Sequence, residues 1–362
     1  MRLIEARQLD DIALGAAVLG TGGGGDPYIG KLMAQQSIRK CQPVQLITVD
    51  EVPDDALVAC SAMMGAPTVM VEKIPSGGEI VEAFKALESY LGKPLYATMS
   101  AEAGGLNSST PFTVAAELGI PLVDADLMGR AFPEIQMVTA TLYGISATPM
   151  AIADEKGNHC IINTFNNRWT ETFARTIAID MGCSAFIGLF VMTGKQLREA
   201  AVAGTISVVE SIGQTIRGAH AAHIDPIEAL RTATNGHLIW KGKIADLYRR
   251  TETGFARGTT VIEGVEEFEG RTLSIDFQNE FLIAREGERV IASTPDLITV
   301  LDAEAGNAIT TESLRYGYRV AVLGMPCDPR WRTQGGIELA GPQYFGYDVD
   351  YVPIEDLAGA AA

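Results

Sequence analysis

The chain has 362 residues, of which 47% are hydrophobic and 20% are charged. This composition is typical of a globular protein and excludes collagenous, low-complexity and disordered classes, and the length predicts two domains. A formal net charge of −17 disfavours nucleic acid and anionic membranes as partners, although a local basic pocket can still bind a small anion.

Helices and strands are predicted to alternate through the first 165 residues. Residues 9–19 place their apolar side chains on one helical face, and Asp26 followed by Pro27 predicts a helix that extends to about Arg39. Strand-like runs and helical patterns then follow one another, at 44–49, 57–62, 79–91 (helix), 94–99, 111–118 (helix), 121–125, 149–154 and 160–165. This order predicts an α/β fold, with a mainly parallel sheet in three layers.

The pattern changes twice in the second half of the chain. Residues 168–235 are predicted to be helical, with long helices at 168–182 and 195–219 and a shorter one that begins at Asp225-Pro226. From about 237 the apolar residues alternate with period two, which predicts an antiparallel β-barrel-like domain. We therefore expect an α/β domain over 1–236, a β domain over 237–330 and a tail over 331–362 that can pack back on the first domain.

A glycine-rich stretch, GTGGGGDPYIG at 20–30, matches the dinucleotide fingerprint G-x-G-x-x-G. Asp50 follows the next strand and can bind a ribose, but the segment before the glycines has a helical pattern where the fingerprint needs a strand. Three interpretations stay open: a nucleotide site, a hinge without a ligand, and a cradle of backbone N–H groups for a small polar or anionic ligand.

Three further loops follow predicted strands and carry polar side chains. Ligands of open α/β sheets bind beyond the carboxyl ends of the strands, so we expect these loops and the glycine loop to meet. Their candidate residues are Glu72 and Lys73 in 61–73, Glu102 and Asn107 in 100–111, and Asp124, Asp126, Arg130 and Glu134 in 123–134.

The pair Asp124 and Asp126 has two interpretations. Two crowded carboxylates can divide acid and base roles, because burial and repulsion separate their pKa values, or they can bind Mg²⁺. Alternatively, Asp124 caps a turn and Arg130 forms a structural ion pair with Asp126 or Glu134.

Histidine and cysteine patterns favour structural roles. His220 and His223 are three residues apart near a predicted helix end, a spacing that suits a metal ion but more often serves the helix dipole or solvent. Cys60 and Cys183 are expected to pack rather than to act as nucleophiles. The five cysteines share no C-x-x-C spacing, and neither a signal peptide nor a membrane-spanning run is evident. We expect a soluble cytoplasmic protein with reduced thiols.

The loops together resemble a known family. The stretches GTGGGGDP, MGAPTVMVEK, AEAGGLN, VDADLMGRAFPE, GKI, TPDLITV and RYGYRVAVLGMP are similar to those of the S-methyl thiohydantoin desulfurase family, over roughly residues 8–355. The resemblance implies an α/β domain, a β-barrel-like domain and hydrolytic removal of sulfur from a hydantoin-like ring. It also implies a cyclic amide or thioamide substrate and association with a hydantoinase-type protein. The cofactor stays unknown, since the sequence itself requires none.

The implied reaction assigns roles to the candidate residues. Water must attack the ring carbon that carries sulfur, which requires a base, an acid and donors for the developing charge. The hypothesis makes Asp124 or Asp126 the base and Glu102 its partner. Asn107 and the Gly22, Gly23, Gly24 and Gly25 amides hold the ring or its side-chain carboxylate, and Arg130 pairs with an anionic substituent or sets the pKa of a carboxyl group. The other expected substrate-binding residues are Asp26, Glu72, Lys73 and Glu134.

Two other functional classes stay open. The chain can be a non-catalytic binding or regulatory subunit of a hydantoinase/oxoprolinase-type system, with a homo-oligomer interface on its apolar surface. It can also be a nucleotide-dependent enzyme that uses Gly20–Gly25, and a divalent metal stays open in either case.

Overall fold

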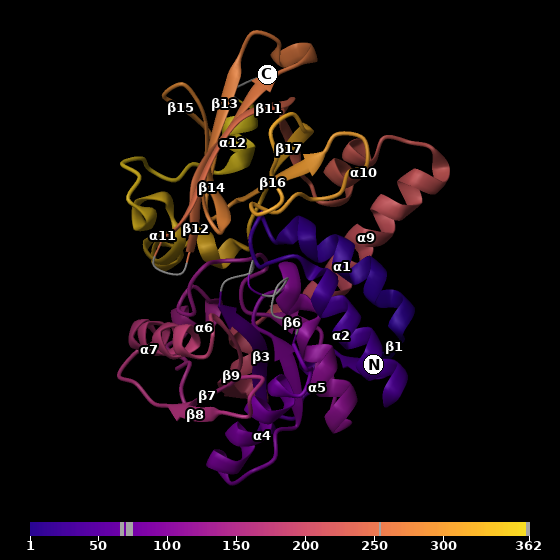
Figure 1. Ribbon diagram of the computed structural model, residues 1–362, viewed down its shortest axis with the longest axis vertical. Coiled ribbons are helices and arrows are strands. Elements are labelled where there is room, and N and C mark those ends of the chain that lie inside the picture. Colours follow the sequence, from indigo (N-terminus) through magenta and orange to yellow (C-terminus); the bar gives the residue numbers. More distant parts are fainter. Residues whose placement is uncertain (66–68, 70–74, 253–254, 360–362) are drawn as a thin grey trace.

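The first domain is built on one mixed sheet of eight strands (Figure 1). The computed structural model describes residues 1–65, 69, 75–252 and 255–359. The strand order is β1-β2-β5-β4-β3-β9-β7-β8; β2, β5, β4 and β3 run parallel, and antiparallel strands lie on both sides of them. The strands are β1 (Arg2–Ile4), β2 (Val44–Ile47), β3 (Leu57–Gly65), β4 (Ala97–Ser100), β5 (Leu122–Val123), β7 (Met150–Ala153), β8 (His159–Ile162) and β9 (Ser184–Thr193).

Helices cover both faces of this sheet. On one face Phe84 and Leu87 of α4 pack against Ala59 and Phe186, and on the other Ala174 of α7 joins the core that contains Cys60. The strands read as apolar runs because both of their faces are buried. The helices are α1 (Leu9–Leu19), α2 (Pro27–Lys40), α4 (Glu79–Leu91), α5 (Thr110–Leu118), α6 (Thr139–Leu142), α7 (Asn167–Asp180), α8 (Gly194–Ala200), α9 (Thr205–Ala222) and α10 (Pro226–Ala233).

The second domain is an antiparallel half-barrel of seven strands, in the order β15-β14-β13-β12-β11-β17-β16. In β13 the residues Leu273, Ile275 and Phe277 are buried and alternate with more exposed neighbours, which is the period of a strand with one face on a core. The strands are β11 (His237–Glu252), β12 (Phe255–Gly264), β13 (Thr272–Gln278), β14 (Glu280–Glu286), β15 (Arg289–Ser293), β16 (Leu297–Asp302) and β17 (Arg319–Met325).

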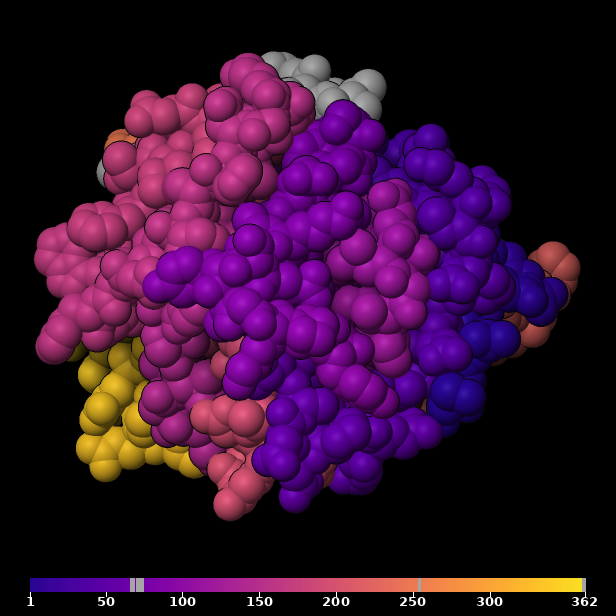
Figure 2. All heavy atoms as spheres, turned by 90° about the horizontal axis from the view of Figure 1, so that it is seen from below, coloured from indigo at the N-terminus to yellow at the C-terminus, as the bar shows by residue number. Residues whose placement is uncertain are grey.

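The segment after β17 contains α11 (Gln334–Ala340) and α12 (Ile354–Gly359). Its first part returns to the first domain, where the Trp331 indole N–H donates to the Met128 carbonyl at 2.8 Å, whereas Ile354 of α12 packs in the core of the second domain. Tyr344 in turn donates its hydroxyl hydrogen to Glu134 at 3.0 Å. Viewed from the first domain, the yellow C-terminal segment shows at the margin of a surface made mostly of that domain (Figure 2).

The predicted fold class is confirmed, and several elements agree closely. The helices predicted at 9–19 and 79–91 are α1 and α4, and Asp26 caps α2 by accepting the Tyr28 N–H at 2.8 Å. The period-two region forms the half-barrel. Among the described residues, no helix has the length and apolar character that crossing a membrane requires.

The prediction for 168–235 is wrong in two places. Strand β9, with ten residues, lies in this region and pairs antiparallel with β3 in the interior of the sheet. The helix expected over 195–219 is interrupted by β10 (Val202–Ala203), which pairs with β6 (Ala125–Asp126). At β10 the pairing with β6 overrides helix propensity, whereas the sequence of β9 is itself rich in Phe, Ile and Val, which strands favour.

Candidate functional site

The described residues of the expected loops meet in one cavity, of about 100 Å³, at the carboxyl ends of β3 and β4; those of the loop 61–73 that line it are 62–65, at the end of β3. Apolar residues of β3, β9 and the loop after β6 form much of its wall, and β13–β14 of the second domain closes it. Its polar lining consists of Glu102, Asn107, Glu134, Glu171, Arg175, Asn279 and Glu280.

Glu102 follows β4 and presents a buried carboxyl group to the cavity. Its Oε1 atom accepts a hydrogen bond from the Asn107 side-chain amide at 2.7 Å, whereas Oε2 has no hydrogen-bond partner among the described residues. Burial raises the pKa of Glu102 to about 8. The Asn107 bond and the Phe132 amide lower the pKa, and the charge of Asp126 raises it. A protonated Glu102 can therefore donate a proton near neutral pH.

Asn107 holds the loop after β4 against the end of β3. Its Oδ1 atom accepts the Met63 N–H at 2.7 Å, and its amide hydrogens go to the Met63 carbonyl at 3.1 Å and to Glu102. Both hydrogens of the side-chain amide are thus used inside the protein. Asn107 orients Glu102 rather than offering these donors to a ligand.

Asp126 lies behind the cavity wall and is fully buried. Its carboxylate accepts backbone N–H bonds from Ala103 at 2.7 Å and from Gly129 at 2.9 Å, and so ties the loop of Glu102 to the loop after β6. Burial raises the pKa of Asp126 to about 7, although the backbone N–H groups lower it; the charge of Asp328 raises it further.

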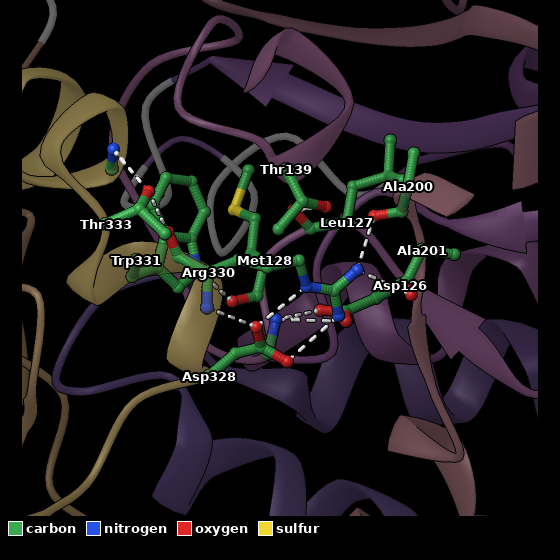
Figure 3. Close-up of polar contacts among 12 residues, drawn as sticks. Asp126, Leu127, Met128, Thr139, Ala200, Ala201, Asp328, Arg330, Trp331 and Thr333 are labelled. Carbon is green, nitrogen blue, oxygen red and sulfur yellow. Dashed lines mark hydrogen bonds and ion pairs between the residues drawn. The ribbon is translucent and has the colours of Figure 1, made fainter. Parts of the chain in front are cut away.

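A half-buried ion pair lies beside Asp126 in Figure 3. Arg330 pairs with both carboxylate oxygens of Asp328 and donates to the Ala200 and Ala201 carbonyls. The pair anchors the C-terminal segment next to the loop that bonds Asp126.

Glu280 is one of four polar lining residues that the sequence analysis missed; the others are Glu171, Arg175 and Asn279. Glu280 begins β14, is 2% exposed and lines the cavity; its Oε1 atom accepts the Gly24 N–H at 3.2 Å. Its Oε2 atom has no partner among the described residues. Burial raises the pKa of Glu280 well above its usual range; the charge of Glu102 also raises it, and Arg130 lowers it.

The glycine loop joins the two domains. Thr21 and Gly22 accept backbone bonds from Phe281 and Thr311 of the second domain, at 2.7 and 2.8 Å. The Gly23 N–H donates to the Gly20 carbonyl at 2.8 Å, and a Cβ atom on Gly23 would lie 2.0 Å from Glu280 Oε1. A side chain here would displace that carboxyl group.

Little of the glycine loop faces the cavity. Gly24 lines it, whereas Gly22, Gly23 and Gly25 are not among its lining residues, and Asp26 borders a separate pocket between α1 and α2. The loop also lacks the strand that a dinucleotide fingerprint requires, since it follows the helix α1.

Arg130 is buried at the junction of three segments. Its guanidinium donates to Thr21 Oγ1 at 3.0 Å, to the Pro295 and Asp296 carbonyls at 2.7 and 2.8 Å, and stacks 4.3 Å from the Phe132 ring centre. Burial lowers the pKa of Arg130 to about 10, while Glu280 raises it. It is not among the cavity-lining residues, so it holds the junction.

Of the other predicted carboxylates, Glu134 lines the cavity and Asp124 does not. Asp124 accepts the Ser207 N–H at 3.0 Å in the first turn of α9 and is not a lining residue. Glu134 lines the cavity and accepts hydrogen bonds from Gln136 and Tyr344. Glu72 and Lys73 lie outside the described residues.

The histidine and cysteine candidates are not among the residues that line the cavity. The His220 ring bonds the Ala305 carbonyl at 2.8 Å, and the described residues contain no group of three or more His, Cys, Asp or Glu placed to hold a metal. Burial, with the charge of Asp126, raises the pKa of the Cys60 thiol well above its usual range, which disfavours a reactive thiolate.

Comparison with known proteins extends over nearly the whole chain. The N-terminal domain model of the S-Me-THD-like family matches residues 7–164, and its C-terminal domain model matches residues 165–354. A crystal structure of a protein from Chromobacterium violaceum shares 25% identity and a TM-score of 0.82, over 98% of this chain and 100% of that one. No curated protein matches the sequence. The chain belongs to the S-Me-THD-like family.

Proposed function

We propose that this protein hydrolyses a sulfur-bearing, hydantoin-like ring in the cavity between its two domains. The oxygen of water forms a bond to the ring carbon that carries the alkylthio group, and the bond between that carbon and sulfur breaks. The sulfur leaves as a thiol with one proton of the water, the other proton ends on the adjacent ring nitrogen, and the ring carbon becomes a carbonyl carbon. Family membership supports the substrate class, and the buried carboxyl of Glu102 is the observation that carries the chemistry.

Glu102 is suited to proton transfer at this carbon. Its pKa of about 8 keeps a proton available near neutral pH, and its Oε2 atom has no other partner among the described residues. Protonation of a ring nitrogen or of the leaving sulfur by Glu102 makes the carbon a better electrophile. Asn107 and Asp126 act by positioning Glu102, through its side chain and its loop respectively.

The direct test is thiol release from an S-methyl thiohydantoin by the purified protein. We expect turnover by the wild type and a loss of about 10²–10⁴-fold in kcat for Glu102→Gln, the usual contribution of a positioned acid or base. The control Glu338→Gln changes an exposed carboxylate and should retain full activity. If the wild type binds the ring without releasing thiol, the protein is instead a non-catalytic binding subunit. If Glu102→Gln keeps full activity, Glu102 takes no part in proton transfer.

A further inference from the structure

One edge of the first-domain sheet has no partner strand among the described residues. Strand β8 is the last of the eight strands and pairs with β7 alone. At the turn between these two strands the Asp154 N–H donates to the Asn158 carbonyl at 2.9 Å, and bonded and non-bonded residue pairs alternate along an antiparallel ladder. The N–H and C=O groups of His159 and Ile161 therefore point away from β7, toward the open edge.

This edge carries none of the features that commonly keep an edge strand from pairing. The β8 sequence is His-Cys-Ile-Ile, without a lysine, an acidic residue, a proline or a bulge. At the opposite edge of the sheet, Arg2 of β1 forms an ion pair with Glu210 and donates to Ser207 of α9 at 3.1 Å. The charged Arg2 disfavours a further strand at that edge, so β8 is the edge that is open to pairing.

A groove of about 470 Å³ lies between β8 and α7, at one margin of the first domain (Figure 1). The residues that line it are all uncharged: Ile161, Ile162, Asn163, Thr172, Phe173, Thr176 and Ile177. Four aromatic side chains in or beside the groove are exposed by 93%, 51%, 47% and 55%, in the order Phe165, Trp169, Phe173 and Tyr90. The Trp169 and Phe173 ring centres are 5.5 Å apart, and the Asn163 amide donates to the Tyr90 hydroxyl at 3.1 Å. The groove and these side chains form one surface with the strand edge, the β8–α7 face.

The area of the β8–α7 face suits a stable protein interface. A fully exposed aromatic side chain offers about 150–250 Å², so at these exposures the four aromatic side chains together offer roughly 500 Å². A standard interface buries about 800 Å² on each partner. The aromatic side chains alone supply more than half of this area, and the groove and β8 add to it.

The charge of the face indicates what kind of partner it fits. Its lining and aromatic residues carry no formal charge, whereas the whole chain carries −17. A basic partner would be attracted to acidic surfaces rather than to this face. Two copies of the chain can meet on an uncharged face, because exposed charges separated by more than about 8 Å are largely screened at physiological ionic strength. A second copy is therefore the partner that the face fits.

We propose that the protein forms a two-fold symmetric dimer through the β8–α7 face. Strand β8 pairs antiparallel with β8 of the second copy, so that the two sheets become one, and Trp169 and Phe173 of the two α7 helices pack against each other across the axis. A two-fold axis makes an edge strand antiparallel to its own copy, and the outward groups of His159 and Ile161 then find partners on both sides. This inference concerns assembly and does not depend on the proposed reaction.

Sedimentation velocity of the full chain over a range of concentrations tests the proposal. We expect the wild type at micromolar concentration to have twice the chain mass of 38.6 kDa. Phe173→Glu brings two like charges together across the axis, and Ile161→Lys places a charge on the pairing edge. Each change occurs twice in the dimer, so we expect each variant to raise the dissociation constant at least about 30-fold.

Val208→Glu and Ile224→Lys are matched controls, because these apolar side chains are 47% and 57% exposed and lie in and just after α9, away from the face. Both controls should stay dimeric. Added salt should tighten the dimer, because screening weakens the repulsion between two chains of charge −17. Near-UV circular dichroism checks that each variant keeps its tertiary packing.

Hydrogen exchange of the wild type tests the strand pairing without any variant. The His159 and Ile161 amides should exchange more slowly as the protein concentration rises. The proposal is overturned by a monomeric wild type, by a dimer that both folded variants keep, by a dimer that the controls dissociate or salt weakens, or by exchange at these two amides that is independent of concentration.

Discussion

At the scale of single residues, the buried carboxyl groups make stability depend on pH. The folded-state pKa of Glu102, about 8, lies above its ordinary value of 4.5, so the folded protein binds this proton more tightly than the unfolded chain. The stabilising contribution is fully present below about pH 4.5 and is lost as the pH rises through about 8. The pH range in which Glu102 can donate a proton is therefore also the range in which its contribution to the free energy of unfolding declines.

Glu102→Gln cannot ionise and should remove this dependence. We expect the free energy of unfolding of the variant, relative to wild type, to increase between about pH 5 and pH 8, by at most about 1.4 kcal/mol for each pH unit. Urea titrations at several pH values measure the difference, with Glu338→Gln as an exposed control. A difference that stays constant with pH would show that the Glu102 carboxyl is not perturbed.

Asp126 should affect activity through the position of its neighbours. In Asp126→Asn an amide NH2 replaces an oxygen that accepts the Ala103 or Gly129 N–H, so we expect destabilisation by about 1–3 kcal/mol. We also expect kcat to fall on the order of 10²-fold well below the melting temperature, because Glu102 is displaced. Asp124→Asn, which perturbs the Ser207 contact in α9, should cost stability but not kcat. Equal kcat values for the two variants would contradict the positioning role of Asp126.

At the scale of elements, the glycine loop sets the position of Glu280. Gly23 is not in the left-handed region, so alanine is compatible with its backbone, but the new Cβ would contact the Glu280 carboxyl. We expect Gly23→Ala to retain most of its stability and to lose activity, because the displaced Glu280 carboxyl group lines the cavity. Gly218→Ala, in open space on α9, should instead stabilise by about 0.5–1 kcal/mol without changing activity. A fully active Gly23→Ala protein would contradict the contact between loop and carboxyl.

The elements differ in how well the sequence predicts them. Local signals were sufficient where an element is amphipathic or capped, as in α1, α2 and α4, and where period two persists, as in β13. Strand β9 was missed because its partners β3 and β7 are more than 30 residues away in the chain and its run carries no periodicity.

The residues of the candidate site were likewise predictable only in part. Glu102, Asn107 and Glu134 line the cavity as expected, because the rule about strand ends in α/β sheets depends only on the order of elements. Glu280 could not be predicted, since a charged residue in a tight hairpin is usually solvated, and only the docking of the half-barrel on the glycine loop buries it.

At the scale of the whole molecule, the two domains form one site because buried groups join them. Arg130 of the first domain bonds Pro295 and Asp296 of the second, and Thr21 of the glycine loop. Arg130→Met leaves these oxygens buried without donors, and we expect the free energy of unfolding to fall by about 3–5 kcal/mol, as when one partner of a buried charged network is removed. Chemical denaturation measures this; a loss below about 1 kcal/mol would show that the junction is held by other contacts.

The most direct test of the account is a crystal structure of the protein soaked with an S-methyl thiohydantoin, using Glu102→Gln to slow turnover and the anomalous signal of the ligand sulfur to place the ring. We predict that the ring lies in the cavity between the two domains, with a ring nitrogen or the sulfur in hydrogen-bond distance of residue 102 and the sulfur-bearing carbon open to water. A ring bound instead in the pocket between α1 and α2, beside Asp26, would contradict the central claim.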